Sequence, residues 1–297
     1  MLVAAGPGLL RAVAVMRSHG TRFECLRVRP GDHICWVFAG PDGFAELARP
    51  FLAEGLARGE KLMYVAADSS PVGVAGLAGL AGPPVLEVAS IADVYGASGI
   101  VDAARQRATF AAALAGALAE GFTGIRVAAD NTPLVTGQTR LKAWIEWEIT
   151  ADRFMSENLV TGLCAFDRDR VEVDRLRHLA TLHPLSAAGS PVPQFRLFAD
   201  TGDLCIEGEI DSLTVDQLRL ALAVSPPRTG VLIDLAAATI RGRRALASLG
   251  YLAGDGVAVT IHGEPAAIAQ LRTASPPTGG QLTFCETPPA TPASPSG

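Results

Sequence analysis

Two side chains capable of metal binding, redox chemistry or ligand contact lie close together near the start of the chain. His33 and Cys35 lie in segment 31–40, whose other residues include the apolar run 36–39. Glycine and proline flank this segment, which predicts a short strand buried on both faces. Because side chains alternate along a strand, His33 and Cys35 should face the same side. The pair could bind a soft metal or contact a ligand, and it also fits a capped strand start with a buried thiol.

Composition limits the classes of protein to which the chain can belong. The 297 residues, of which 49% are hydrophobic and 19% charged, favour two globular domains. The net charge of −5 offers no basic face, so we expect no direct nucleic-acid binding. Glycine, proline or charge interrupts every apolar run, so no membrane segment is predicted. The 5 cysteines are irregularly spaced, which is typical of reduced thiols in a cytoplasmic protein.

Strands alternate with helices along the chain, which predicts an α/β fold with parallel pairing and right-handed crossovers. In the first half, the predicted strands are 31–40, 62–66, 85–88, 124–129 and 159–166, and the predicted helices are 44–58, 101–120, 139–155 and 171–182. Pro50 is expected to disturb the first helix. The smaller second half has predicted strands at 195–198, 204–210, 230–235, 257–261 and 282–284, and predicted helices at 214–222, 236–252 and 265–271.

The same pattern divides the chain into segments. Residues 1–21 are predicted to be a loose leader, without the basic start and cleavage site of a signal peptide. A first domain spans 22–184, and a linker rich in proline, glycine and serine spans 185–194. A second domain spans 195–286, and the tail 287–297 is predicted to be disordered.

Candidate ligand contacts come from the ends of the predicted strands and from one helix. Parallel sheets bind ligands beyond the carboxyl ends of their strands, in apolar crevices with a few polar groups. The predicted ligand-binding residues are His33, Cys35, Asp130, Trp147 and Glu148. Asp130 also suits a turn, and Trp147 also suits a helix core. His33 lies at the amino end of its strand, away from a crevice at the carboxyl end.

Metal binding and catalysis receive less support from the sequence. Zinc-binding side-chain types occur at His33, Cys35, Cys164 and His183. No paired C-x-x-C motif accompanies them; Cys164 fits a core strand and His183 fits a helix end. We therefore assign no metal ligand and no cofactor. No nucleophile motif such as G-x-S-x-G is present, so we expect no enzyme activity and no catalytic residue.

Several short motifs occur in a fixed order through the first half. They are Gly31-Asp-His-Ile-Cys35, Gly59-Glu-Lys-Leu-Met-Tyr-Val65, Gly124-Ile-Arg-Val127 with Asp130, Trp147-Glu148, Leu163-Cys-Ala-Phe-Asp167 and His183-Pro184. On these motifs, residues 22–184 resemble the MEDS domain, the methanogen/methylotroph, DcmR sensory domain. The resemblance implies a RecA/KaiC-like parallel three-layer sheet and a sensor of small organic molecules, with His33 and Cys35 as ligand-contacting groups.

The implied relationship to ATPases can be tested on one loop. A phosphate-binding loop requires glycines followed by Lys and then Ser or Thr. The corresponding loop here is 40–43, followed by Phe44 and Ala45, with neither Lys nor Ser/Thr. We therefore expect no ATP hydrolysis, and a scaffold reused for binding.

The second half resembles a different family. Segments 204–211 and 231–235 are similar to strands of a STAS domain, the fold of anti-sigma factor antagonists. In phosphorylatable members, an Asp-Ser-Ser-Gly motif follows at a helix N-terminus; here the aligned residues are Gly242-Arg243-Arg244-Ala245. Arginines in place of both serines argue against a phosphorylation switch. Asp211, Arg243 and Arg244 become candidate partner contacts, although the arginines also fit solvated positions of a drifted domain.

Together, these features predict a non-enzymatic signalling protein that regulates transcription. Ligand occupancy in the first domain would change how the STAS-like domain binds an anti-sigma factor or a kinase-like regulator. Two alternatives remain: a protein-interaction scaffold without a ligand, and a metal-binding sensor based on His and Cys.

Overall fold

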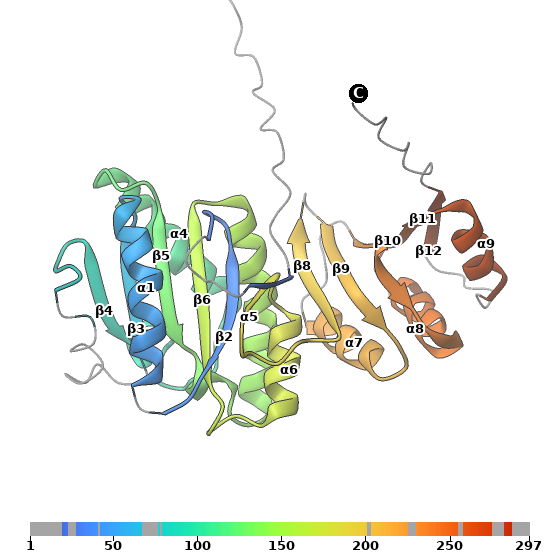
Figure 1. Cartoon of the computed structure of the whole chain (residues 1–297), viewed down its shortest axis with the longest axis horizontal. Helices are drawn as coiled ribbons and strands as arrows, with labels where there is room; N and C mark the ends of the chain where they lie inside the picture. Colours follow the sequence, from blue (N-terminus) through green and yellow to red (C-terminus); the bar gives the residue numbers. More distant parts are fainter. Residues whose placement is uncertain are drawn as a thin grey trace, which may run out of the picture.

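The computed structural model describes residues 20–22, 28–40, 42–66, 77, 79–200, 203–224, 230–254, 258–274 and 282–286. The predicted tail 287–297 and residues 1–19 of the predicted leader lie outside this part of the chain. Within it, two sheets and the helices that cover them form a mixed α/β structure (Figure 1).

The first sheet contains seven strands among the described residues, in the order β1-β7-β2-β6-β5-β3-β4, and every neighbouring pair is parallel. The strands are β1 (Gly20–Arg22), β2 (His33–Phe38), β3 (Lys61–Ala66), β4 (Leu86–Ser90), β5 (Ile125–Asp130), β6 (Val160–Asp167) and β7 (Leu185–Ala187). The helices between them are α1 (Gly43–Ala57), α3 (Ile91–Tyr95), α4 (Ala103–Ala119), the 3-10 helix η1 (Thr132–Val135), α5 (Gln138–Glu157) and α6 (Val173–Thr181).

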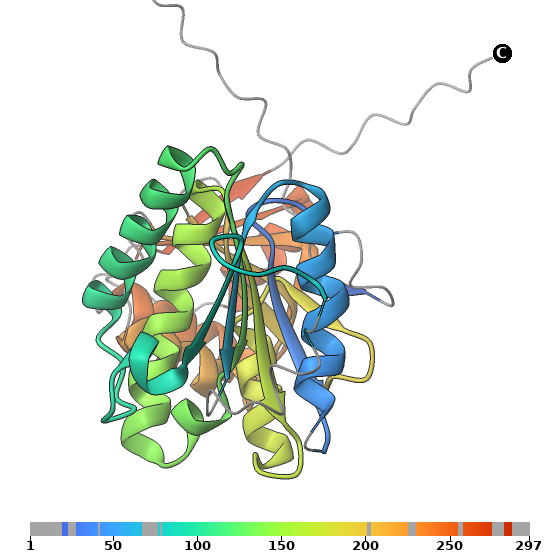
Figure 2. The ribbon, with the colours of Figure 1, turned by 90° about the vertical axis from the view of Figure 1, so that its left-hand side faces the viewer.

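Helices cover both faces of this sheet. Figure 2 shows α1 on one face and α4 with α5 on the other. The alternation along β2 matches this arrangement: Ile34 and Phe38 pack into the core under α1, whereas Cys35 and Val37 pack into the core under α5. His33 is fully buried and belongs by alternation to the α5 face.

The second sheet contains five strands among the described residues, in the order β12-β11-β10-β9-β8. Strands β8 and β9 are antiparallel, and the other pairs are parallel. The strands are β8 (Phe195–Asp200), β9 (Asp203–Ile210), β10 (Val231–Ile240), β11 (Val259–Gly263) and β12 (Leu282–Glu286), and the helices are α7 (Thr214–Val224), α8 (Gly242–Gly254) and α9 (Pro265–Ala274).

The two sheets do not have separate cores. Helix α5 contacts both β8 and α7, and α6 also contacts β8. One continuous cluster of buried apolar side chains includes Trp144 and Ile149 of α5 together with Leu197 of β8 and Leu218 of α7. The edge strand β8 is therefore packed against the helical layer of the first sheet, and movement of α5 is expected to affect it.

Helices α3 and η1 were not predicted, and three further segments differ from the structure that the sequence predicted. Residues 185–187, predicted as linker, form β7 between β1 and β2, and residues 20–22, partly predicted as leader, pair with β7. Residues 236–240, predicted as helix, extend β10, because a register shift between Ile233 and Ala238 lets pairing with β9 continue.

Pro50 does not interrupt α1, which runs from Gly43 to Ala57. The fully buried Phe51 and Leu52 anchor this helix to the sheet. Packing of this kind can outweigh the loss of one backbone hydrogen bond at proline. Among the described helices, none is both long enough and apolar enough to cross a membrane.

Candidate functional site

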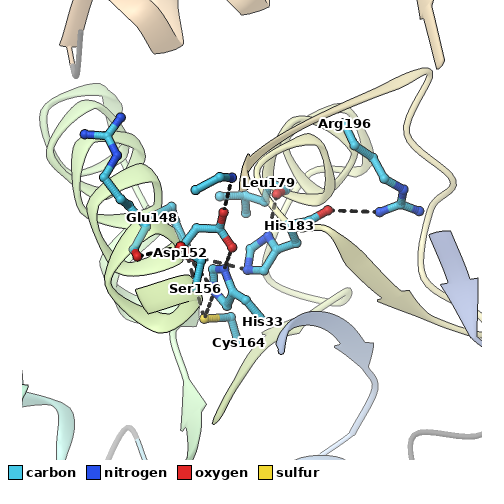
Figure 3. Close-up of polar contacts among 10 residues, drawn as sticks. His33, Glu148, Asp152, Ser156, Cys164, Leu179, His183 and Arg196 are labelled. Carbon is cyan, nitrogen blue, oxygen red and sulfur yellow. Dashed lines mark hydrogen bonds and ion pairs between the residues drawn. The ribbon is translucent and has the colours of Figure 1, made fainter. Parts of the chain in front are cut away.

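Four buried side chains bring potential ligand atoms together between the first sheet and α5 (Figure 3). They are His33 of β2, Glu148 of α5, Cys164 of β6 and His183, which follows α6. We call these four residues the four-ligand cluster. One nitrogen, oxygen or sulfur atom of each lies within 4.8 Å of the others, and none of the four residues is more than 7% exposed.

Glu148 lies at the centre of the four-ligand cluster. Its Oε2 is 3.1 Å from Nε2 of His33, 3.5 Å from Nε2 of His183 and 3.8 Å from Sγ of Cys164. The His33 Nε2 and the Cys164 Sγ are 3.4 Å apart. The atoms are therefore close enough to share a single bound ion or proton.

The sheet positions the two members that come from strands. His33 of β2 is the register partner of Gly162 on β6, and Cys35 is the register partner of Cys164. A Cβ atom at Gly162 would lie 2.8 Å from Sδ of Met155, so the absence of a side chain makes room for Met155 beside His33.

Helix spacing and a helix end position the remaining groups. Glu148 and Asp152 are four residues apart on α5, so both face the sheet. The ring of His183 is held by its Nδ1, which lies 2.8 Å from the backbone oxygen of Leu179 in the last turns of α6. Because that oxygen only accepts, Nδ1 of His183 carries the proton and donates it.

The two histidines titrate differently. Burial alone would lower the pKa of His33, but its hydrogen bonds to Asp152 and Glu148 outweigh burial and raise its pKa to about 8. Burial lowers the pKa of His183 to about 4, so this ring is neutral at pH 7. Burial opposes ionisation of Glu148, yet His183 and His33 more than offset it and lower its pKa. Burial and the Glu148 charge raise the pKa of Cys164.

Asp152 connects the four-ligand cluster to the second sheet. Its Oδ1 is 3.2 Å from Nδ1 of His33, and its Oδ2 accepts a hydrogen bond of 2.6 Å from the backbone N–H of Ala199 in β8. A second connection runs through Arg196, also in β8, which donates to the backbone oxygen of His183 at 3.1 Å and to Oγ of Ser186 at 2.9 Å. Both connections join cluster residues to the same edge strand.

A small apolar cavity of about 20 Å³ adjoins the four-ligand cluster. Its walls come from α4, α5, β5, β6 and the end of α3, and they include Tyr95, Phe110, Trp147, Phe154, Met155 and Cys164. Cys164 therefore belongs both to the cavity wall and to the four-ligand cluster. A molecule in the cavity would contact its thiol.

Comparison with known families identifies the first half of the chain. Residues 32–184, which are more than half of the sequence, match the model of the methanogen/methylotroph, DcmR sensory domain, MEDS. The chain belongs to the MEDS family. All members of the four-ligand cluster, and Asp152, fall inside the matched region. A comparison with curated proteins returned no match. A MEDS domain indicates a signalling or sensor role.

The structure brings together only part of the predicted ligand set in the MEDS domain. His33 and Glu148 belong to the four-ligand cluster, and Trp147 lines the adjoining cavity. Cys35 is buried next to Cys164 but is not one of the four ligands, because the side chain of Cys164 is the one that reaches His33 and Glu148. Burial and Glu148 raise the Cys35 pKa.

Asp130 lies outside the four-ligand cluster, at the carboxyl end of β5. Asp130 ends β5 and accepts from the backbone N–H of Thr132 at 3.1 Å, which is turn chemistry. The four-ligand cluster lies beneath α5, against the amino-terminal part of β2, which is where His33 is located. The predicted crevice lies instead at the carboxyl ends of the strands.

The predicted ligand-binding set did not include three residues that form or contact the four-ligand cluster: Asp152, Cys164 and His183. The side-chain types of Cys164 and His183 were recognisable, but their proximity to His33 depends on strand order. Asp152 carried a usable signal, because its spacing of four residues from Glu148 on a predicted helix places both carboxylates on one face.

The predicted partner contacts lie at the starts of two helices beside the second sheet. Asp211 accepts from the backbone N–H groups of Leu213 and Thr214 at 2.7 and 2.9 Å, so it caps the start of α7. Arg243 and Arg244 are exposed in the first turn of α8, and Arg244 forms an ion pair of 3.2 Å with Asp216.

Proposed function

We propose that this protein is a non-enzymatic sensor whose MEDS domain binds a small, mainly apolar organic molecule in the cavity beside Cys164. Occupancy would be transmitted through α5 to the second sheet. The observation that carries this proposal is the position of Asp152, which contacts His33 with one oxygen and Ala199 of β8 with the other. Membership of a sensory family gives the input role its basis.

The cavity limits the class of ligand. Its volume of about 20 Å³ is comparable with the roughly 10–15 Å³ that one water requires on the same measure. The walls are mainly aromatic and aliphatic, so the ligand is expected to have one or two carbon-sized groups and few polar atoms. Cys164 and Tyr95 are lining residues whose side chains carry a polar group.

The path to the second sheet is short. Trp147, Ala151 and Phe154 of α5 line the cavity, and Asp152 is on the same turn of that helix. A ligand that displaces α5 would change the contact between Asp152 and Ala199 of β8. Because α5 and β8 pack closely, a small displacement is expected to be transmitted and not absorbed.

We propose that the second sheet is a STAS-type output module, and that the first is derived from a RecA/KaiC-type scaffold. The second sheet is mixed, and its parallel strands alternate with helices, which supports the STAS-type assignment. The first sheet is all-parallel and is covered by helices on both faces, which supports the RecA/KaiC-type assignment. The partner would be an anti-sigma factor or a kinase-like regulator, bound through a surface that includes Arg243 and Arg244 and controlled without serine phosphorylation. The regulated process would be transcription.

The cavity hypothesis can be tested with alcohols of increasing length. Methanol, ethanol, 1-propanol and 1-butanol are titrated into the full-length protein while tryptophan fluorescence is recorded, because Trp147 lines the cavity. Hydrogen exchange of the β8 peptide is measured in parallel. We expect saturable changes with methanol and ethanol, which fit the cavity volume, and none with 1-propanol or 1-butanol.

A matched pair of variants makes this test specific. Ala129→Val adds two methyl groups inside the cavity, whereas Ala128→Val adds them on the opposite face of β5, in the core under α1. We expect Ala129→Val to abolish the saturable response and Ala128→Val to retain it. The absence of any saturable response in the folded wild type would instead support a ligand-free interaction scaffold.

A further inference from the structure

We propose that the four-ligand cluster is a metal site that binds one divalent transition-metal ion, with Zn²⁺ as the expected ion. This proposal goes beyond the small-molecule function and does not depend on it, because it uses atoms of the four-ligand cluster and not the volume of the cavity. The donor set is two imidazole nitrogens, one thiolate and one carboxylate oxygen. Imidazole and thiolate together suit Zn²⁺, whereas Mg²⁺ and Ca²⁺ prefer sites made only of oxygen.

The separations between the ligand atoms fit tetrahedral coordination. Zinc bonds of about 2.0–2.3 Å at tetrahedral angles place neighbouring ligand atoms roughly 3.3–3.7 Å apart. Four of the six separations within the cluster are 3.1, 3.4, 3.5 and 3.8 Å, and all six are within 4.8 Å. An ion at the centre would therefore require shifts of about 1 Å or less.

Both histidine rings are oriented as metal-binding rings usually are. A ligating histidine commonly donates its other ring N–H to a carboxylate or a backbone carbonyl. Nδ1 of His33 faces Oδ1 of Asp152, and Nδ1 of His183 faces the backbone oxygen of Leu179. The two Nε2 atoms are then directed toward the cluster.

The environment of His183 gives an independent indication. Its Nε2 is buried and has no hydrogen-bond partner among the described residues. Because Nδ1 carries the ring proton, Nε2 presents a lone pair, and the nearest charged atom is the carboxylate Oε2 of Glu148 at 3.5 Å. Two electron-rich atoms that face each other in a buried site are unfavourable unless a cation or a shared proton lies between them.

Charge balance also supports a divalent ion. The carboxylate of Glu148 and the thiolate of Cys164 would together neutralise an M²⁺ ion, so the buried first shell would carry no net charge. Four protein ligands complete a tetrahedral shell, which is the arrangement of a structural or sensing site and not of a catalytic site with an open position. Because Cys164 also lines the cavity, a molecule bound there would contact a metal ligand.

Cobalt substitution of the full-length protein tests the proposal. The protein is reduced, treated with a chelator, and titrated with Co²⁺ and then Zn²⁺. We expect one Co²⁺ per chain, intense visible d–d absorption from tetrahedral coordination, and a near-ultraviolet thiolate-to-cobalt band. Zn²⁺ should abolish both signals by displacement.

Three variants identify the ligands. Cys164→Ser should lose the thiolate band, and His183→Gln should weaken Co²⁺ binding by more than the roughly 10–100-fold that outer-shell changes cost. Cys35→Ser is the matched control, because Cys35 is a buried thiol beside Cys164 in register but outside the four-ligand cluster. It should retain both bands.

Two results would overturn the proposal. The first is failure of the folded, reduced wild type to bind either ion, which would leave His33 as a structural cation between Glu148 and Asp152. The second is unchanged cobalt spectra in folded Cys164→Ser and His183→Gln. If a variant does not fold, the wild-type titration and the thiolate band still decide the outcome.

Discussion

Two buried groups of charged side chains lie on opposite faces of the first sheet. They differ in which hydrogen-bonding atoms face each other. On the α1 face, Arg126 donates to carboxylate oxygens of Glu60 and Glu54 and, at 3.1 Å, to the backbone oxygen of Phe51. Each contact joins an N–H group to an oxygen. On the α5 face, the four-ligand cluster instead sets Nε2 of His183 against Oε2 of Glu148.

The comparison shows that burial of charge does not by itself indicate function. The Arg126 group fits a stabilising role, because carboxylate and carbonyl oxygens surround the buried guanidinium, although its Nη2 has no hydrogen-bond partner among the described residues. In the four-ligand cluster, Nε2 of His183 has no hydrogen-bond donor or acceptor among the described residues and faces a carboxylate oxygen, and Asp152 joins the cluster to the second sheet. Substitutions in the two groups should therefore separate a stabilising group from a binding group.

The largest effect on stability is expected from Arg126→Met. Loss of the guanidinium leaves the buried Glu60 unpaired, which should lower the free energy of unfolding by about 3–5 kcal/mol. Urea denaturation measures this, and Co²⁺ binding by the folded variant should be unchanged. The exposed Arg105→Met is the control, with an expected change within about 0.5 kcal/mol. Equal effects of the two variants would contradict the comparison.

The four-ligand cluster should respond to metal where the Arg126 group does not. Zn²⁺ at 100 times its Kd should raise the free energy of unfolding of the wild type by about 2.7 kcal/mol. Glu148→Gln should lose this stabilisation, because it removes the central carboxylate of the cluster. Glu146→Gln, exposed on the same helix, should keep it. Stabilisation of Glu148→Gln equal to that of the wild type would contradict the assignment of ligands.

A smaller effect is expected where α1 packs on the guanidinium. A Cβ atom at Gly55 would lie 2.6 Å from Cδ of Arg126, so Gly55→Ala should destabilise the protein by about 1–3 kcal/mol. Gly116→Ala in α4 meets no atom within 4 Å and should stabilise by about 0.5–1 kcal/mol. Thermal unfolding of both variants tests whether the two substitutions change the stability in opposite directions. Stabilisation by Gly55→Ala would show that the packing around Arg126 is loose.

The smallest effect concerns Asp211 in the second sheet. Hydrogen bonds from the backbone N–H groups of Thr214 and Leu213 lower the pKa of Asp211 to about 2. Because its folded pKa lies below the unfolded value of about 3.9, its contribution is complete above that value and is lost as pH falls through the folded pKa. Asp211→Asn should therefore be less stable than wild type at pH 7. If the difference in stability between wild type and Asp211→Asn does not become smaller in acid, the capping role of Asp211 is contradicted.

The sequence predicted the alternation of strands and helices well, because each buried strand is an apolar run between glycine or proline turns. It missed β7 at residues 185–187, because three residues in a proline-rich context carry no periodicity. It also ended β10 early, because the bulge before Ala238 interrupts the alternation.

The candidate site was only partly predictable from the sequence, for a physical reason. His33 and Glu148 belonged to recognisable motifs, but Cys164 and His183 join them only because β6 pairs with β2 and α6 returns the chain beside them. Side-chain types are visible in a sequence, whereas their convergence depends on strand order and on which face of a helix meets the sheet.

The proposed function requires that the buried site on α5 communicates with the second sheet through Asp152. Hydrogen exchange of the β8 peptide, Phe195–Asp200, in full-length Asp152→Ala tests it most directly, with exposed Glu146→Ala as the matched control. Loss of a buried acceptor costs about 1–3 kcal/mol, so exchange in β8 should accelerate roughly 5–150-fold in Asp152→Ala and remain unchanged in Glu146→Ala. Unchanged exchange in both variants would contradict the account.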